Sequence, residues 1–221
     1  GVEPASVLEL GAGTCPFARR SVFPSRARVV HTDLSPFMLA RAADGNPGGA
    51  RPTLVAANAL SLPFKGSFDL VVMVYDAINY VMTENDLLRC LREARRVLAP
   101  GGLFLFDVTT ESNSLRHFKD GLDFGELEGC TFVRESSYDR KAMLQRNDFT
   151  FFVEEENGAW RRYKEGHQQR IYRLGRLKAL ARKAGFRVEG CFEGFTFRQG
   201  REASERVHFA LREPTPRETR R

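Results

Sequence analysis

The sequence predicts an α/β domain built on a mostly parallel sheet, with a smaller β-rich segment inserted after its fifth strand. Short apolar runs alternate with stretches of helical period over residues 5–110. A glycine turn follows the first of these runs, and residues 112–172 alternate at a period of two. A chain of 221 residues suits one such domain with an insertion.

The composition limits the function classes. Hydrophobic residues make up 42% of the chain, enough for a full core, and no apolar run reaches the roughly 18 residues of a membrane span. No secretory signal precedes the first strand. The four cysteines lie far apart and form no C-x-x-C pair, so we expect no metal site and a reducing compartment. We therefore predict a cytoplasmic protein without a membrane partner.

The net charge is +6, but it is unevenly distributed. Residues 111–156 hold 11 acidic against 6 basic side chains, whereas residues 161–187 hold 10 basic side chains and one acidic, Glu165. We favour a solvated surface with cross-strand ion pairs. The alternative is an acidic substrate or a polyanion, because phosphates attract a basic segment.

The stretch VLELGAGTC, residues 7–15, predicts a strand that ends in a ligand-binding turn. Gly11 and Gly13 accept positive φ and let a ligand lie against bare backbone. Thr14 can cap a following helix, whose first turn accommodates Pro16. This arrangement is typical of nucleotide sites, but the dinucleotide pattern G-x-G-x-x-G would need glycine in place of Pro16.

The second strand, residues 28–32, ends in Asp33, about 20 residues after the glycine turn, as in nucleotide-binding α/β folds. A carboxylate there can accept hydrogen bonds from both hydroxyls of a ribose. Ser35 and Pro36 then begin a helix. A third strand is expected over residues 53–57.

The stretch FDLVVMVYDAINY predicts a central strand followed by a polar and aromatic cluster of Tyr75, Asp76, Asn79 and Tyr80. Ligands of open α/β sheets bind beyond the carboxyl ends of the strands, so this cluster should face the glycine turn. The remaining chain predicts helices from residue 83 or 85 to 98 and over 177–184, and strands over 103–108, 186–197 and 205–211.

The succession ELGAGT, HTDLSP, NALSLPF, FDLVVMVYDAINYV and RRVLAPGGLFLFDV resembles the ordered motifs of class I S-adenosylmethionine-dependent methyltransferases. It is similar to a bacterial small-molecule subgroup that carries a β-sheet lid after the fifth strand. The resemblance implies a seven-stranded Rossmann-like sheet, mostly parallel with an antiparallel last strand. It also implies S-adenosylmethionine as the cofactor and a small acceptor methylated on oxygen or nitrogen. The core would span residues 1–111 and 173–221, and the lid residues 112–172.

The resemblance also implies site residues. Cys15 stands where a third glycine is usual, and Asn58 where aspartate is usual, although its carbonyl can still accept a hydrogen bond from the adenine amine. Substrate contacts are expected from Asp76, Asn79, Tyr80, Arg170 and Tyr172. Cofactor contacts are expected from Glu9, Gly11, Ala12, Gly13, Cys15, Asp33, Leu34, Met38, Asn58, Ala59 and Tyr75.

Within the lid, Asn157-Gly158 separates two strand-like runs and predicts a two-residue hairpin turn. Glu154 then falls opposite Arg161, which suits an ion pair. Aromatic side chains of these strands form an apolar face over the cofactor cleft or merely hold the small sheet together; they are Phe132, Phe149, Phe151, Trp160 and Tyr163.

The segment EGHQQRIY, residues 165–172, resembles the end of the lid in this subgroup. Alternation sends Glu165, His167 and Gln169 to one face, and Arg170 and Tyr172 to the other. His167 is the candidate general base, because histidine ordinarily titrates near neutral pH. A single histidine on a strand is usually structural, so both interpretations stay open.

Three other classes remain. An RNA-modifying methyltransferase would use the basic residues 161–187, a dehydrogenase would share Asp33 and the glycine turn, and a non-catalytic protein would only bind S-adenosylmethionine. A homodimer is allowed, and a nucleic-acid partner is disfavoured. Methyltransferases of this kind usually place a helical segment before the first strand. Residues 1–6 therefore predict a more open cofactor site or a missing leader.

Overall fold

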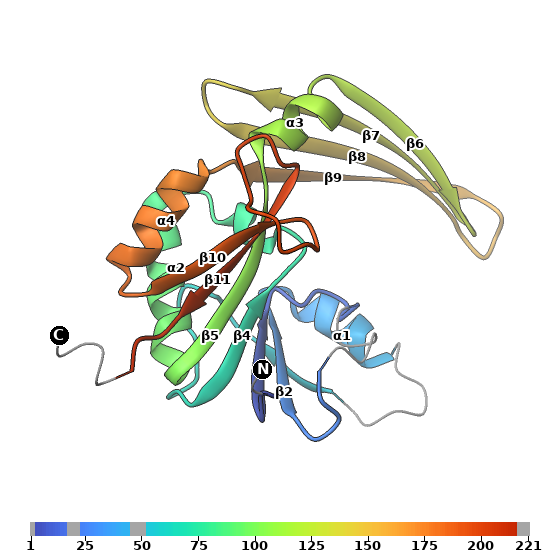
Figure 1. Cartoon of the computed structure of the whole chain (residues 1–221). Coiled ribbons are helices and arrows are strands. Elements are labelled where there is room, and N and C mark those ends of the chain that lie inside the picture. The colour runs from blue at the N-terminus through green and yellow to red at the C-terminus, as the bar shows by residue number, and fades with distance from the viewer. Residues whose placement is uncertain (1–2, 17–22, 45–51, 216–221) are drawn as a thin grey trace.

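The computed structural model describes residues 3–16, 23–44 and 52–215. Within these ranges the chain forms a seven-stranded sheet of the order β10-β11-β5-β4-β1-β2-β3 and a four-stranded sheet of the order β6-β7-β8-β9. Figure 1 shows the small sheet above one end of the large one, reaching out over the side where α1 lies. The molecule therefore has a core sheet and a lid.

The large sheet confirms the predicted fold class. β1 to β5 pair in parallel, whereas β11 runs antiparallel to both β5 and β10. β1 lies between β2 and β4, so the chain leaves β1 toward one edge and later returns to the other side, the kind of switch point where α/β sheets bind ligands. The strands are β1 (Ser6–Leu10), β2 (Arg28–Asp33), β3 (Thr53–Ala56), β4 (Phe68–Met73), β5 (Leu98–Thr109), β10 (Arg187–Glu193) and β11 (Arg206–Arg212).

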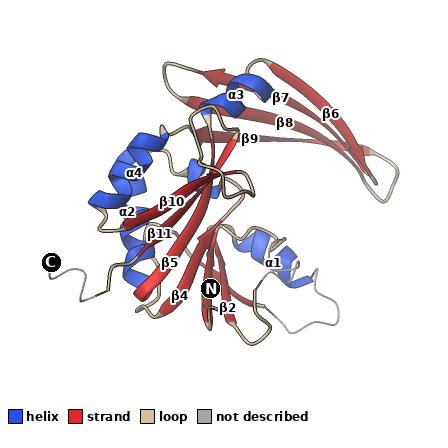
Figure 2. Cartoon of the chain, in the orientation of Figure 1, coloured by secondary structure: helices blue, strands red, loops and turns tan. Residues whose placement is uncertain are grey.

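Helices cover both faces of the core sheet. Figure 2 shows α2 (Glu84–Val97) and α4 (Leu174–Lys183) together on one side and α1 (Pro36–Asp44) on the other. The predicted caps are in place. The Ser35 hydroxyl accepts a hydrogen bond from the Met38 N–H at 3.3 Å, and the Thr83 hydroxyl accepts one from Asp86 at 3.1 Å. The helix expected after Pro16 and the end of the C-terminal tail lie outside the described residues.

The core lies between the sheet and the pair α2 and α4. Central strands covered on both faces are apolar along their length, which explains the run from Phe68 to Met73 and the phenylalanines of β5. Phe106 stacks on Phe209 of the antiparallel strand with ring centroids 4.9 Å apart. This packing fixes β11 beside β5 and so positions the first residue of β11, Arg206.

The lid is an antiparallel meander of β6 (Gly121–Leu127), β7 (Cys130–Asp139), β8 (Leu144–Glu154) and β9 (Trp160–Arg170). A short helix that the sequence did not predict, α3 (Glu111–His117), leads into it from β5. A 3-10 turn labelled η2 (Ala77–Tyr80) lies beneath β9.

The predicted register of the last hairpin is wrong by one residue. Glu154 lies opposite Trp160, and Arg161 lies opposite Val153. Backbone pairing of Glu155 with Ala159 closes a three-residue loop in which Gly158 has a φ of +80°, rather than a two-residue turn. Arg161 therefore pairs with the loop residue Glu155, at 2.8 Å.

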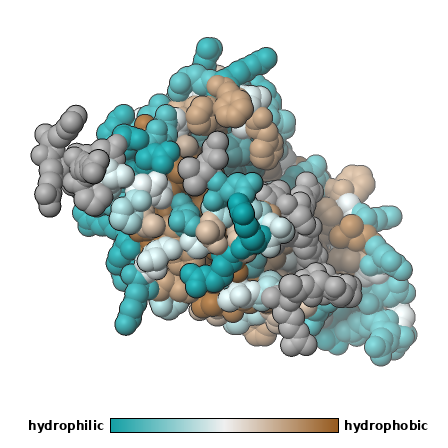
Figure 3. Space-filling model, turned by 60° about the horizontal axis from the view of Figure 1, so that its bottom comes forward, coloured by the Kyte–Doolittle hydropathy of each residue, from teal (hydrophilic) through white to brown (hydrophobic). Residues whose placement is uncertain are grey.

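Seen from below, the surface is a mixture of polar and intermediate residues with apolar ones in small groups (Figure 3). None of the described helices has an apolar stretch long enough to cross a membrane.

Candidate active site

The turn after β1 needs glycine for two reasons. Gly11 and Gly13 have φ values of +67° and +55°, which side chains rarely tolerate. A Cβ on Gly11 would also lie 3.0 Å from the Cβ of Ala77, so the turn and η2 pack against each other. Cys15 adopts a φ of +56° without being glycine and is almost fully buried. The thiol thus occupies the place of the usual third glycine at the cost of a left-handed backbone.

Asp33 ties this turn to the end of β2. One carboxylate oxygen accepts a hydrogen bond from the Gly13 N–H at 2.7 Å, and the other accepts one from the Ser35 N–H at 2.8 Å. A carboxylate has about four acceptor positions, so two remain for a ligand. The two backbone bonds hold the carboxylate at the mouth of a cavity.

That cavity, here called the cofactor cavity, has a volume of about 770 Å³ and lies between the carboxyl ends of the strands and the lid. Leu34 at its mouth is 72% exposed, an apolar side chain that a ligand could cover. Seven of the predicted cofactor residues line it: Gly11, Asp33, Leu34, Met38, Asn58, Ala59 and Tyr75. The other lining residues are Thr32, Ser35, Ala57, Leu60, Met73, Val74, Ala77, Tyr80, Val81, Met82, Asp86, Glu165 and His167.

The remaining predicted cofactor residues lie outside this lining. Glu9 is buried and its carboxylate bonds to His31 Nδ1 at 2.6 Å. Ala12 and Cys15 pack against Ala42 of α1. Gly13 contributes its N–H to Asp33. These residues therefore support the turn after β1 and do not line the cavity.

Asn58 is held by a local turn. Its side-chain carbonyl accepts a hydrogen bond from the Leu60 N–H at 2.9 Å, and its backbone pairs with Ser61. This turn places the Asn58–Leu60 backbone on the cavity wall. The carbonyl oxygen is therefore shared between the loop and any ligand.

Tyr75 and Asp76 form a sharp turn whose two side chains line different cavities. Their φ values are +59° and +51°, two left-handed non-glycine residues in succession. Such strain concentrates at functional sites. Tyr75 lines the cofactor cavity, whereas Asp76 lines a second cavity under the lid.

The second cavity, here called the acceptor cavity, has a volume of about 340 Å³. Its floor is a directed chain of hydrogen bonds. The Ser114 hydroxyl donates to Gln145 at 2.8 Å, Gln145 donates to Gln169 at 3.0 Å, and Gln169 donates to Asp76. The cavity is lined by Asp76, Tyr80, Thr109, Asn113, Phe118, Arg134, Gln145, Asn147, Phe149, His167, Gln169 and Arg206.

Arg206 forms ion pairs with two carboxylates beneath this floor. Its guanidinium bonds to Asp76 at 2.7 Å and also to Asp107, which is 1% exposed. The Asp76 N–H donates to the same Asp107 carboxylate at 3.1 Å. The network therefore holds the strained turn against β5 and β11.

Strand β9 presents its residues as the alternation predicts. Glu165 and His167 line the cofactor cavity, and His167 and Gln169 line the acceptor cavity. Arg170 turns away and donates to the Ala142 carbonyl at 2.6 Å, and Tyr172 is buried with its hydroxyl on the Val81 carbonyl.

Asn79, also predicted to bind substrate, is fully buried. Its amide bonds to the backbone of Thr109 and to the Arg170 carbonyl. The structure thus brings Asp76, Tyr80 and His167 together at the cavities and places Asn79, Arg170 and Tyr172 in supporting positions.

Tyr80 and His167 border both cavities. The Tyr80 hydroxyl lies 3.1 Å from His167 Nδ1, and His167 Nε2 lies 3.1 Å from Glu165. Burial, followed by the nearby carboxylates of Asp76 and Glu165, raises the pKa of Tyr80. The phenol therefore keeps its proton at neutral pH.

Comparison with known proteins matches residues 7–102 to the family model described as a methyltransferase domain. Over 210 residues the chain is 29% identical to the protein named "Putative methyltransferase YqeM" from Bacillus subtilis, covering 94% of this chain and 83% of that one. The family match and this relative both indicate a methyltransferase.

Two solved structures support the fold of the methyltransferase. An S-adenosylmethionine-dependent methyltransferase from Clostridium acetobutylicum is 19% identical with a TM-score of 0.82, covering 95% of this chain and 84% of that one. CalS10, an amino pentose methyltransferase from Micromonospora echinaspora with S-adenosylmethionine bound, is 22% identical with a TM-score of 0.71, covering 96% and 84%.

The charge of the cofactor cavity suits S-adenosylmethionine, the cofactor that the sequence motifs imply. Its lining includes three carboxylates, Asp33, Asp86 and Glu165, and none of its lining residues is lysine or arginine. S-adenosylmethionine carries a sulfonium and an ammonium group, which such a cavity attracts. A dinucleotide would bring a pyrophosphate, which it would repel. In the part of the chain that is described, no cluster of His, Cys, Asp or Glu could hold a metal ion.

Sequence reasoning missed seven of the twelve residues that line the acceptor cavity. Arg206 comes from the last strand, and its role depends on packing that no local pattern reveals. Gln145 and Asn147 alternate with polar Arg146 and Asp148, so no apolar alternation marked which side faces inward. Thr109 is the last residue of β5, and Asn113 lies in the first turn of the unpredicted helix α3.

Proposed function

We propose that the chain transfers a methyl group from S-adenosylmethionine to a small polar molecule bound in the acceptor cavity. The observation that carries this proposal is the shared border of the two cavities at Tyr80 and His167. Asp33, Asn58 and Tyr75 hold the cofactor, and the acceptor approaches from below the lid. The cofactor supplies an activated methyl group, so the protein mainly has to orient the acceptor and exclude water.

The acceptor cavity favours a compact molecule with oxygen or nitrogen groups. Its volume of about 340 Å³ is near the lower end of small-ligand sites. Aromatic Phe118 and Phe149 offer flat walls, while Asn147 and Arg134 offer hydrogen-bond donors. We infer O- or N-methylation of such an acceptor. His167 is the candidate base at the point where the methyl group crosses.

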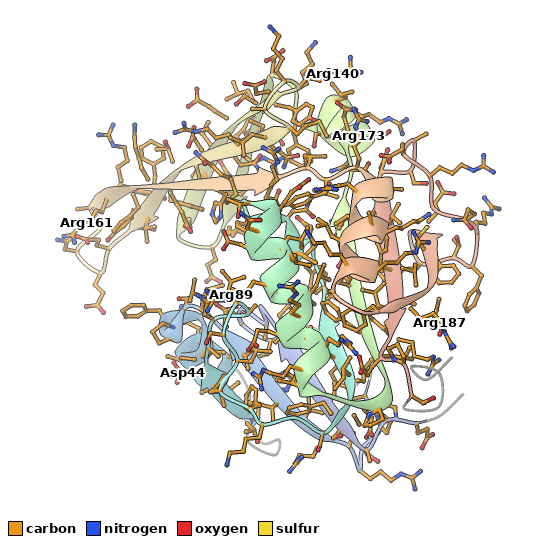
Figure 4. The ribbon with its side chains drawn as sticks, turned by 90° about the vertical axis from the view of Figure 1, so that its left-hand side faces the viewer. Asp44, Arg89, Arg140, Arg161, Arg173 and Arg187 are labelled. Carbon is orange, nitrogen blue, oxygen red and sulfur yellow. The ribbon has the colours of Figure 1, made fainter. Side chains whose placement is uncertain are left out.

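An RNA-modifying activity is less well supported. The basic residues between 161 and 187 do not gather on one surface. Figure 4 shows Arg161 at the far tip of the lid, Arg173 near its base and Arg187 on the opposite side of the molecule. Arg161, Arg173 and Arg187 also pair with Glu155, Glu111 and Glu189. Phosphate groups would have to compete with these carboxylates.

The proposal is tested by incubating the protein with methyl-labelled S-adenosylmethionine and a cell extract separated into small-molecule and RNA fractions. Label should accumulate in the small-molecule fraction, and any RNA binding should be weak and vanish at raised salt. Label recovered mainly in RNA would replace this proposal with the RNA-modifying one. Cofactor binding without transfer to any fraction would favour a non-catalytic binding protein.

A further inference from the structure

Three side chains form a line of polar contacts at the border of the two cavities. Tyr80 Oη is hydrogen-bonded to His167 Nδ1 at 3.1 Å, and His167 Nε2 makes an ion-pair contact with Glu165, also at 3.1 Å. The edge of the His167 ring also meets Phe149, with centroids 5.6 Å apart and planes at 86°. The ring is thus held from β8, β9 and η2.

The partners determine where the imidazole proton lies. An ionised glutamate can only accept hydrogen bonds, so Nε2 of neutral His167 must carry the proton that faces Glu165. Nδ1 is then an acceptor, and the Tyr80 hydroxyl donates to it. The lone pairs of the Tyr80 oxygen are left for a third group.

That third group can only come from the cavities. Tyr80 is half exposed and lines both of them, and among the described residues its oxygen has no hydrogen-bond partner besides His167. An acceptor with an N–H or O–H directed at the border would donate to this oxygen. The arrangement follows the logic of the serine-protease triad, in which a carboxylate orients a histidine that takes a proton from a hydroxyl.

We propose that Tyr80 removes the proton of the methyl acceptor while passing its own proton to His167 Nδ1, with Glu165 stabilising the resulting imidazolium. This inference rests on the proposed function. The acceptor lone pair forms the new bond to the methyl carbon, and the electron pair of the broken carbon–sulfur bond remains on sulfur. The acceptor proton replaces the Tyr80 proton, and His167 later releases its extra proton to water. Tyr80 is the catalytic residue, and His167 and Glu165 act through it.

The relay needs neutral His167, because an imidazolium has no lone pair left to accept the Tyr80 proton. The charged and titratable groups around the ring come from every neighbouring element: Tyr80 and Asp76 beside η2, Asp86 of α2, Arg134 of β7, Glu165 of β9 and Arg206 of β11.

The tautomer is tested without any acceptor. In protein labelled with 15N-histidine, the His167 signals are identified by their loss in His167→Asn. While the imidazole is neutral, the His167 signals should show a protonated Nε2 and an unprotonated Nδ1. Tyr80→Phe should shift the Nδ1 signal, whereas Tyr163→Phe, a lid tyrosine outside both cavities, should not. A proton on Nδ1 would overturn the relay.

Turnover is tested with labelled S-adenosylmethionine and the small-molecule fraction that the wild-type protein methylates. Tyr80→Phe and His167→Asn should each reduce turnover about 100-fold or more, the range of general acid–base catalysis. The double variant should be no slower than the single ones, because both break one proton path. Losses that multiply in the double variant would refute the relay.

Controls separate this inference from the proposed function. Cofactor affinity by calorimetry should change less than about threefold in each variant, and His117→Asn, an exposed histidine paired with Glu205, should behave as wild type. If the wild-type protein labels no small molecule, the proposed function fails. If it does so and Tyr80→Phe is equally fast, only the relay fails.

Discussion

The side chain of Asn79 bonds to both backbone groups of Thr109. Its carbonyl accepts from the Thr109 N–H at 3.0 Å, and its amide donates to the Thr109 carbonyl at 3.3 Å and to Arg170 at 2.8 Å. One fully buried side chain therefore joins the end of β5 to the end of β9.

Asn79→Ala should destabilise the protein by about 2 to 4 kcal/mol, because it leaves buried backbone groups without partners. Thermal unfolding followed by circular dichroism measures this loss. Asn85→Ala, an exposed asparagine on α2, is the matched control and should change little. Equal stability of the two variants would show that Asn79 does not join the strands.

Asp33→Ala should weaken binding of S-adenosylmethionine about tenfold or more, since a charge-assisted acceptor contributes roughly 1.5 to 3 kcal/mol. Calorimetry measures the affinity. The control is Asp139→Ala, because Asp139 also accepts from two backbone N–H groups, of Lys141 and Ala142, but far from the cavity. An unchanged affinity in Asp33→Ala would remove this carboxylate from the cofactor site.

Glu9→Ala should cost about 3 kcal/mol of stability, because it leaves His31 buried without its partner. Glu9→Gln keeps an acceptor for His31 and should restore much of the loss. Cofactor affinity of Glu9→Gln, measured at low temperature, should stay within about threefold of wild type. A stable Glu9→Gln protein that binds the cofactor ten times more weakly would instead assign Glu9 to the cofactor site.

Cys130 should react with iodoacetamide at pH 8 well before Cys90. Burial, and to a lesser extent Glu93, raises the pKa of Cys90 to about 12, so this thiol stays protonated and shielded. Cys130 lies partly exposed at the start of β7. Peptide mass spectrometry gives the labelling rates, and denaturant should remove the difference. Fast labelling of Cys90 in native protein would contradict its burial on the core-facing side of α2.

The sequence predicted which residues gather around the cofactor cavity, because most of them belong to short-range features. Gly11, Asp33 and Asn58 each lie at the end of a strand or within two residues of it, and the ends of parallel strands meet at one edge. Glu9 shows the limit of this reasoning. Its place in the motif suggested a ligand contact, whereas alternation along β1 turns it into the interior toward His31.

The acceptor side could not be predicted in the same way, because it depends on register and on long-range packing. A hairpin loop of three residues instead of two moved every cross-strand pair of β8 and β9 by one position. Arg206 meets Asp76 across 130 positions of sequence, a contact created by the packing of β11 on β5. Neither feature leaves a local pattern.

The turn at Tyr75 and Asp76 divides the two cavities along the chain as well as in space. Most of the cofactor cavity comes from residues before Asp86, whereas the acceptor cavity draws most of its wall from residues 109–169. Relatives could therefore exchange one stretch of coding sequence and acquire a different acceptor while keeping the same methyl donor. Tyr80 belongs to the core and His167 to the lid, so a new lid would have to preserve the hydrogen bond between these two side chains.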